Sequence, residues 1–245
     1  MRFVACVAPS PVVAPGVRFL AMASIEAVFL DVGGVLTLPA VAEAASFLTA
    51  HGAHGSAEEV ERLHYLGMLA HDEAASSAGS GPPYLKGFLE AAGLSADLAG
   101  AFDAAIRPAG WRPAIRSSLE ALPALAATGV RLAIVSNSDG TLEERLVRTG
   151  VAQVGPGPGV ALRALIDSGA VGIEKPDPRI FELALSACCV GPEAAVHVGD
   201  SRRMDVAGAI AAGIRPLHMD PFDLCPDRSH EHIHTLREVI ELVRR

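Results

Sequence analysis

The chain has 245 residues, of which half are hydrophobic and 20% are charged, and its formal net charge is −8. This composition supports a large buried core and excludes wholesale disorder, and the negative charge disfavours nonspecific binding to nucleic acid or to an anionic membrane. No apolar run approaches the roughly 20 residues that a membrane-spanning helix needs. We therefore expect a globular protein with neither a nucleic-acid nor a membrane partner.

The cysteines and the first 23 residues bear on localisation. None of the four cysteines is part of a CxxC pair, so we interpret them as reduced thiols and expect a cytoplasmic protein. Residues 1–23 superficially resemble a secretory signal, but prolines interrupt their apolar part. Because Met22 stands just before the first apolar run, we expect residues 1–23 to be a disordered extension or to precede the true start.

A buried strand is predicted first, at the apolar run Val28 to Leu30. It ends at Asp31, and two glycines, Gly33 and Gly34, follow. A buried strand delivers the carboxylate to the carboxyl edge of a sheet, which is where ligands bind in open α/β folds. A charge in that position needs a metal, a partner or a catalytic role.

Residues 40–110 contain only helical patterns, interrupted by a Ser/Gly/Pro stretch from Ser76 to Pro83 that predicts a loop. The predicted helices are Val41–Ala50, Ala57–Ala70, Tyr84–Ala92 and Leu94–Ile106. We interpret residues 40–110 as an inserted helical cap domain, with residues 24–39 and 111–245 forming the core.

From Trp111 onward, predicted strands and helices alternate. The strands are Val130–Val135, Ala194–Val198 and Ile214–His218, and the helices are Pro113–Thr128, Leu142–Arg148, Asp177–Cys189, Arg203–Ala212 and a last one opened by the capping box Thr235 to Glu238. The glycine-rich segment 153–159 does not fit a GxGxxG motif, and we interpret it as a connection. This alternation predicts an α/β fold with a doubly wound, Rossmann-like parallel sheet.

Polar residues follow three of the predicted strands. Asp31 follows the first, Ser136-Asn137 the second and Gly199-Asp200-Ser201 the third, while Lys175 precedes a helix. Because the carboxyl ends of parallel strands share one edge, we expect these groups to converge. Carboxylates, a lysine and a hydroxyl in one crevice suit Mg²⁺ together with a phosphoryl group.

At these positions the sequence resembles the haloacid dehalogenase (HAD) superfamily. Its four motifs are matched in order by Asp31-Val-Gly-Gly-Val, Val135-Ser136-Asn137, Glu174-Lys175-Pro-Asp-Pro and Gly199-Asp200-Ser201-x3-Asp205. The likeness covers about residues 25–220 and is to subfamily I, whose members carry a helical cap between the first two motifs. It implies a hydrolase, most simply a phosphatase.

The resemblance also implies a role for each matching residue. Asp31 would be the nucleophile and form an aspartyl-phosphate. Ser136 and the backbone at Asn137 would bind the phosphoryl group, and Lys175 would offset charge on the nucleophile and the phosphate. Mg²⁺ would be bound by Asp31, the backbone carbonyl of Gly33, Asp200 and Asp205.

Gly33 departs from the family pattern. Many phosphatases of the family have an aspartate there as general acid, a contribution typically of about 10²–10⁴-fold. Dehalogenases also lack that aspartate, but they use no metal and lack the acidic residue that Asp200 supplies, so phosphate chemistry is favoured. A 2-haloacid dehalogenase and a weakly active phosphate-binding or interaction protein remain the alternatives.

The helical block bears on the substrate. Its basic residues are only Arg62, Lys86 and Arg107, so a polyanionic substrate would be repelled and a small phosphorylated metabolite is expected. The sequence leaves a monomer and a homodimer equally open.

Three histidines, His230, His232 and His234, alternate before the last predicted helix. On an extended segment they would share one face, as metal ligands do. No cysteine or acidic pattern supports such a site, and we interpret the segment as a solvated connector. His197, inside a predicted strand, is interpreted as a core histidine.

Overall fold

The computed structural model describes residues 24–74 and 82–244. The prediction for residues 1–23 and most of the predicted 76–83 loop therefore lie outside the described residues. The strands are β1 (Ala27–Leu30), β2 (Thr37–Pro39), β3 (Trp111–Pro113), β4 (Arg131–Ser136), β5 (Ala152–Val154), β6 (Val160–Leu162), β7 (Ala164–Asp167), β8 (Ala195–Gly199), β9 (Arg215–Met219) and β10 (Glu231–Ile233). The helices are α1 (Val41–Ala50), α2 (Ala57–Glu73), α3 (Pro82–Ala91), α4 (Ala99–Ile106), α5 (Arg116–Ala126), α6 (Leu142–Arg148), α7 (Ser168–Val171), α8 (Pro178–Cys188), α9 (Ala207–Ala211) and α10 (Leu236–Val243).

A six-stranded parallel sheet in the order β10-β9-β8-β1-β4-β7 forms the centre of the α/β part. It confirms the predicted doubly wound, Rossmann-like α/β fold. β1 lies between β4 and β8, so the residues that follow these three strands meet at one edge. The edge strand β7 was not predicted.

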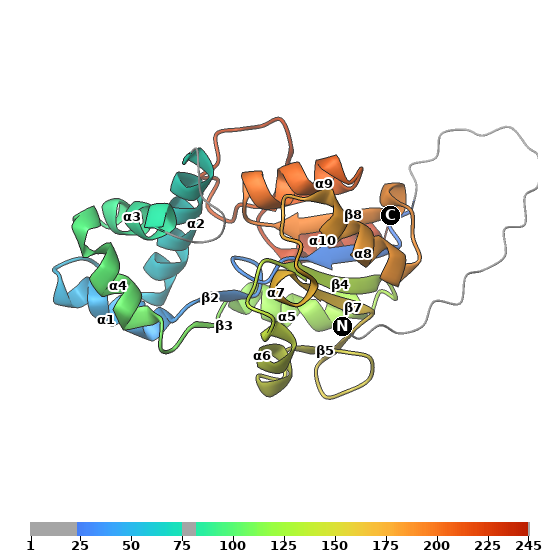
Figure 1. Ribbon diagram of the computed structural model, residues 1–245, viewed down its shortest axis with the longest axis horizontal. Coiled ribbons are helices and arrows are strands. Elements are labelled where there is room, and N and C mark those ends of the chain that lie inside the picture. The colour runs from blue at the N-terminus through green and yellow to red at the C-terminus, as the bar shows by residue number, and fades with distance from the viewer. Residues whose placement is uncertain (1–23, 75–81, 245) are drawn as a thin grey trace, which may run out of the picture.

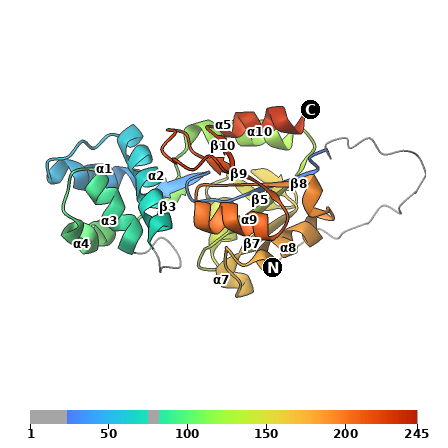
Figure 2. The ribbon, with the colours of Figure 1, turned by 90° about the horizontal axis from the view of Figure 1, so that it is seen from above.

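Helices cover both faces of the sheet, as the alternation of side chains along β1 requires. Val28 and Leu30 belong to a hydrophobic cluster that includes residues of α5 and α10, whereas Ala27 and Phe29 belong to a second cluster with α8 and α9. Figure 2 shows α5 and α10 on one face and α8 and α9 on the other. Both sides of β1 are fully buried, which explains its continuous apolar sequence.

Helices α1 to α4 form a bundle at one end of the molecule, beside the carboxyl edge of the sheet (Figure 1). They bury a hydrophobic cluster of their own, with Leu48, Leu63, Phe88 and Phe102 fully enclosed. The chain enters and leaves the bundle through β2 and β3, which pair antiparallel. None of the helices in the described residues is long and apolar enough to cross a membrane.

The described cysteines differ in state. Cys188 and Cys225 are free and buried, whereas Cys189 is disulfide-bonded. The prediction that all four cysteines are reduced thiols is therefore wrong for Cys189.

Candidate active site

Asp31 lies directly after β1, at the carboxyl edge of the sheet. Its backbone N–H donates to the carbonyl oxygen of Val198 at 2.8 Å, so β8 holds it in place. Three residues on, Gly34 has a φ of +61°, and a Cβ atom there would overlap the carboxylate of Asp200. A glycine is therefore required at Gly34 both by the turn and by the close approach of the loop after β8.

Lys175 lies between two carboxylates. Its ammonium is 2.9 Å from Oδ1 of Asp31 and 2.6 Å from Oδ1 of Asp205, and its side chain is 2% exposed. The side chain of Asn137 fixes the backbone here, because Nδ2 donates to the Lys175 carbonyl at 3.0 Å and Oδ1 accepts from the Lys175 N–H at 2.8 Å. The segment after β4 therefore sets the position of the lysine.

Asp205 is held by residues on both sides of it in the sequence. It lies in a π-helical turn (Arg202–Val206) that follows the loop after β8. Its Oδ1 accepts from Nε2 of His197 at 2.7 Å as well as from Lys175, and its Oδ2 accepts from the Ser201 N–H at 3.1 Å. His197 is fully buried in β8, as its interpretation as a core histidine predicted, and it positions Asp205.

Three carboxylates meet around this lysine. Asp31, Asp200 and Asp205 are all buried, and one oxygen from each lies within 4.8 Å of the others. When ionised they carry three negative charges beside the single positive charge of Lys175. Hard oxygen donors with an excess of negative charge fit a divalent cation such as Mg²⁺.

The pKa values of these groups follow from burial and crowding. Burial raises the pKa of Asp31 against the opposing effect of Lys175, and burial together with the charges of Asp31 and Asp205 raises the pKa of Asp200 well above its usual range. Burial also acts to raise the pKa of Asp205, but Lys175 and His197 hold it below its usual value. The two neighbouring carboxylates raise the pKa of Lys175 although burial opposes them. The negative charge of Asp200 is therefore the least compensated of the three, and a further cation would stabilise its ionised form most.

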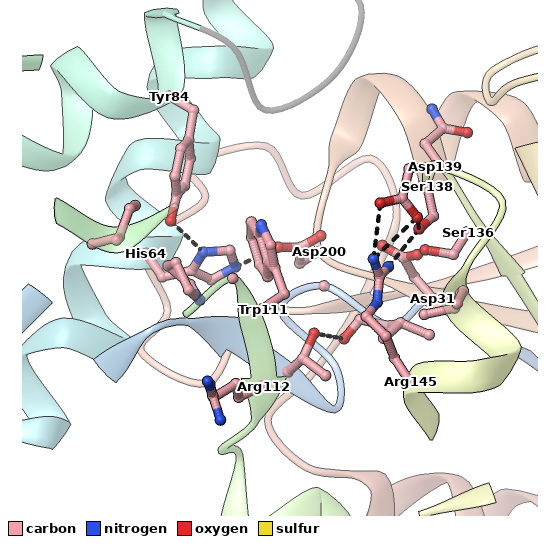
Figure 3. A pocket seen from close by; sticks show the side chains of 18 of the residues that line it. Asp31, His64, Tyr84, Trp111, Arg112, Ser136, Ser138, Asp139, Arg145 and Asp200 are labelled. Atoms are coloured by element: carbon pink, nitrogen blue, oxygen red, sulfur yellow. Dashed lines mark hydrogen bonds and ion pairs between the residues drawn. The ribbon is translucent and has the colours of Figure 1, made fainter. Parts of the chain in front are cut away.

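A cavity of about 750 Å³ lies between this edge of the sheet and the helical bundle (Figure 3). All seven residues that the motifs single out line it: Asp31, Gly33, Ser136, Asn137, Lys175, Asp200 and Asp205. Ser136, at the end of β4, also acts to lower the pKa of Asp31. The cavity has the volume of a small-molecule site, typically about 300–1,000 Å³.

Trp111, the first residue of β3, takes up the space beside Gly33. A Cβ atom on Gly33 would lie 3.3 Å from Cζ3 of the indole, which is tighter than an ordinary contact. The indole also meets the ring of His64 edge-on, with centroids 5.5 Å apart. An aromatic ring therefore lies against the backbone at Gly33.

His64 is a cavity residue that the motifs did not single out. It lies in α2 and is fully buried, with Nε2 2.8 Å from Oδ2 of Asp200 and Nδ1 2.9 Å from the hydroxyl of Tyr84 (Figure 3). Burial lowers the pKa of His64 to about 3, so the ring is neutral. A neutral ring donates through one nitrogen and accepts through the other, so His64 links the hydroxyl of Tyr84 to the side chain of Asp200.

α2 contacts the loop after β8 a second time through Asp72. Its Oδ1 accepts from the hydroxyl of Ser201 at 2.5 Å, and its Oδ2 accepts from the N–H of Arg202 at 2.6 Å. His64 and Asp72 are two helical turns apart and therefore lie on the same side of α2. The bundle thus contacts both Asp200 and the loop that follows it.

Arginines supply most of the positive charge around the rest of the cavity. Those in its lining are Arg107, Arg112, Arg145 and Arg148. Arg145 donates to the hydroxyl of Ser138 at 2.6 Å and pairs with Asp139 at 3.0 Å (Figure 3). Of the three basic residues in the helical block, Arg107 lines the cavity, whereas Lys86 is exposed and Arg62 pairs with Glu59.

The fold and the site together define a class of protein: a doubly wound α/β protein with a carboxylate–lysine centre at the carboxyl edge of its sheet. A family model for haloacid dehalogenase-like hydrolases matches residues 25–213. The chain therefore belongs to the haloacid dehalogenase-like hydrolase family, as the four motifs predicted.

Curated relatives match over a shorter stretch. Phosphoserine phosphatase from Thermus thermophilus is 42% identical over 93 residues, which are 38% of this chain and 34% of that protein. Haloacid dehalogenase-like hydrolase domain-containing protein 3 from Mus musculus is 43% identical over 86 residues, or 35% of this chain and 32% of that protein. Glyceraldehyde 3-phosphate phosphatase from Methanothermobacter thermautotrophicus is 35% identical over 94 residues, or 38% of each chain. The chain thus matches about a third of the length of these relatives.

Solved structures share the fold over nearly the whole chain. A 2-haloacid dehalogenase from Pseudomonas syringae has a TM-score of 0.54 and 25% identity, covering 90% of this chain and 98% of its own. A HAD-hydrolase from Bacillus subtilis, solved with magnesium bound, has a TM-score of 0.59 and 18% identity, covering 91% of this chain and 100% of its own.

Proposed function

We propose that the protein is a Mg²⁺-dependent phosphatase that hydrolyses small phosphomonoesters through an aspartyl-phosphate on Asp31. The observation that carries this proposal is the group of three carboxylates around the Lys175 ammonium, at the edge of a cavity that fits a small molecule. The phosphatase names of two relatives support it. A second carboxylate beside the nucleophile, at Asp200, is the feature that favours phosphate chemistry over dehalogenation, because a metal-free site would leave it uncompensated.

Each of these residues has a chemical part in the proposed reaction. Oδ2 or Oδ1 of Asp31 attacks phosphorus while the bond to the leaving oxygen breaks, and water then cleaves the acyl phosphate to restore the carboxylate. Lys175 offsets negative charge on Asp31 and on the phosphoryl oxygens. Ser136 and the backbone N–H at Asn137 donate to those oxygens.

The metal in this proposal would be held by Asp31, the backbone carbonyl of Gly33, Asp200 and Asp205. When bound, Mg²⁺ supplies charge neutralisation to the phosphoryl oxygens. The donor set fits the ion because it consists of oxygens only and carries more negative charge than Lys175 can balance.

The helical bundle, residues 40–110, is proposed to act as the cap domain that selects the substrate, with residues 24–39 and 111–245 as the catalytic core. Its supporting contacts are those that α2 makes with Asp200 and with Ser201. The leaving group lies under Trp111, where Gly33 provides no acid. Esters or acyl phosphates whose leaving group needs little protonation are therefore the proposed substrates.

Asp31→Asn tests the proposal. We expect it to abolish Mg²⁺-dependent hydrolysis of an aryl phosphate while the circular dichroism spectrum is retained. Asp97→Asn, the same change at an exposed position of the bundle, is the matched control and should remain fully active. Undiminished turnover in Asp31→Asn contradicts the mechanism.

Two further outcomes distinguish the alternatives. Release of chloride from a 2-haloacid that EDTA does not inhibit would support a dehalogenase. Inactivity across a broad panel of phosphate esters, with phosphate or Mg²⁺ still bound, would support a binding protein, which the glycine at position 33 favours.

A further inference from the structure

We propose a second metal site, built by His218, Cys225, His230 and His232, that takes a divalent transition metal of the zinc class. Within the described residues, one ligand atom from each of these four side chains lies within 4.8 Å of the other three. The site is built from residues of β9 and β10 and of the connection between them, at the opposite edge of the sheet from β7. It does not depend on the proposed phosphatase activity.

The pairing of β9 with β10 brings the histidines together. The two strands are parallel, and His218 stands directly opposite His232 in the register. Side chains at paired positions of neighbouring strands point to the same face of a sheet. The rings of His230 and His232 stack with centroids 4.7 Å apart, and both lie about 5 Å from the ring of His218.

All four side chains are withdrawn from water. The side chains of His230 and His232 are 3% and 8% exposed, and Cys225 and His218 are buried. The interpretation of this segment as a solvated connector is therefore wrong for two of its three alternating histidines. The third, His234, is 47% exposed and pairs with Asp223 instead.

The remaining ring nitrogens are arranged as they are in metal sites. A ligating histidine almost always directs its other nitrogen to a carbonyl or a carboxylate, which fixes the ring. Nε2 of His218 lies 3.1 Å from the carbonyl oxygen of Asp200, and Nε2 of His232 lies 2.8 Å from that of Asp227. Nδ1 of His230 lies 3.7 Å from the carboxylate of Asp227.

These partners leave one nitrogen of each of two rings to act as a ligand. A carbonyl oxygen can only accept, so Nε2 of His218 and of His232 each carry a proton, and Nδ1 is the nitrogen of each ring that is left to ligate. Nδ1 of His218 then points at Nε2 of His230 at 2.8 Å, and Nδ1 of His232 lies 3.0 Å from a carboxylate oxygen of Asp220. Arg228 also donates to Nδ1 of His232 at 2.9 Å, so this nitrogen lies beside both a guanidinium and the carboxylate of Asp220. A bound metal ion would replace these contacts between ring nitrogens and their neighbours with ligand bonds.

Metal binding at this site requires only proton transfers and no oxidant or reductant. The thiol of Cys225 loses its proton to solvent and ligates as a thiolate. Nε2 of His230 becomes a ligand when its proton moves to Nδ1, on the side of the Asp227 carboxylate. His218 and His232 ligate through Nδ1, and any proton held there is released to solvent.

The donor set selects the metal. Three imidazoles and one thiolate suit zinc and its borderline-soft neighbours in a tetrahedral arrangement, whereas Mg²⁺ demands oxygen ligands. The carboxylate group at Asp31 has the opposite preference. The two sites can therefore be loaded and assayed separately.

A metal ion at this site would fix the conformation of residues 220–230, which connect β9 to β10. That connection carries Phe222, whose ring lies 5.9 Å from that of Tyr65 in α2. The His218 side chain also contacts the backbone of Asp200. An ion at this site would hold the connection against the bundle and the loop after β8, a structural role.

The experiment is a metal titration of the full chain after removal of metal with a chelator. We expect one equivalent of Zn²⁺ to bind in the presence of excess Mg²⁺, and Co²⁺ in its place to give a thiolate-to-cobalt charge-transfer band and the visible spectrum of tetrahedral Co²⁺. Losing an outer partner of a ligand typically weakens metal binding about 10–100-fold, so losing a ligand should weaken it by at least about 100-fold. Cys225→Ser should abolish the charge-transfer band, and His230→Ala should weaken binding.

His234→Ala is the matched control, because it removes the exposed member of the same alternating set, and it should bind Zn²⁺ as the unaltered protein does. Asp200→Asn should also retain the equivalent of Zn²⁺, which separates this site from the carboxylate group. Absence of tight Zn²⁺ binding to the unaltered protein overturns the proposal. So does a Co²⁺ spectrum that Cys225→Ser leaves unchanged, and both results are independent of whether His230→Ala folds.

Discussion

Gly33→Asp would place a carboxyl group where the site now has none, and its effect can be worked out from the contacts of Gly33. Gly33 does not have a positive φ, so its backbone accepts a side chain. A Cβ atom there would lie 3.3 Å from Cζ3 of Trp111, against about 3.5–4.0 Å for an ordinary carbon contact. The indole must therefore move by a few tenths of an ångström.

The expected magnitude is the difference between two effects. A general acid contributes about 10²–10⁴-fold, or roughly 2.7–5.4 kcal/mol of barrier. Overpacking typically costs about 1–3 kcal/mol. Even if all of that strain opposed the reaction, central values of about 4 and about 2 kcal/mol leave a roughly 30-fold gain. Trp111→Leu should relieve the strain and enlarge the gain.

The assay compares kcat/KM for an alkyl phosphate, whose leaving group needs a proton, with that for an aryl phosphate, whose leaving group does not. We expect Gly33→Asp to raise the alkyl-to-aryl ratio and Gly33→Asn, of the same shape but without an acid, to leave it unchanged. A ratio that stays constant in Gly33→Asp with and without Trp111→Leu would refute the reasoning. An equal rise in Gly33→Asn would do the same.

Three other predictions follow from the contacts of the bundle and the carboxylates. Tyr84→Phe removes the hydrogen-bond partner of Nδ1 of His64, and a buried polar atom left unpaired should cost about 1–3 kcal/mol. The midpoint of thermal unfolding should fall, and an unchanged midpoint would contradict this hydrogen bond. Asp72→Ala leaves the Ser201 hydroxyl and the next N–H without their acceptor, and it should lower the midpoint by a similar amount and raise KM; a change in neither would show that this contact does not hold the bundle on the core. Burial raises the pKa of Asp200 above its unfolded value, so the folded metal-free protein binds this proton more tightly and loses that stability as pH rises through the folded pKa. Mg²⁺ competes with the proton, and its thermal stabilisation should therefore be larger at about pH 8 than at about pH 5.5; equal shifts would argue against binding at this carboxylate.

The convergence of the motif residues could be predicted because each lies in or just after a segment with a clear local pattern. Asp31, Ser136 and Asp200 lie at the ends of buried strands, and the parallel sheet brings those ends to one edge. β7 could not be predicted in the same way. Its side chain at Asp167 nonetheless holds the loop after β4, because its carboxylate accepts from the N–H groups of Gly140 and Leu142.

The residues that the bundle contributes to the site could not be predicted from local sequence patterns. His64 looks like any histidine in an amphipathic helix until α2 is placed against the loop after β8. The alternation of His230 and His232 was visible, but their burial depends on a strand pairing and on Cys225, which approaches through the fold of the connection. Residues whose role arises from the docking of two segments carry no signal in either segment alone.

The two glycines after Asp31 differ in how strictly they are needed, and the difference bears on the proposed substrate. Gly34 is set by the backbone and by the carboxylate of Asp200, so any protein with this close approach needs it. Gly33 is only favoured, by its close contact with the indole of Trp111, which comes from the strand that leaves the bundle and also packs against His64. In the proposed reaction, the absence of an acid is thus coupled to an aromatic ring beside the backbone of Gly33. A site built in this way gives up proton donation to the leaving group and keeps an apolar contact in its place, which favours phosphate esters whose leaving group is stable as an anion.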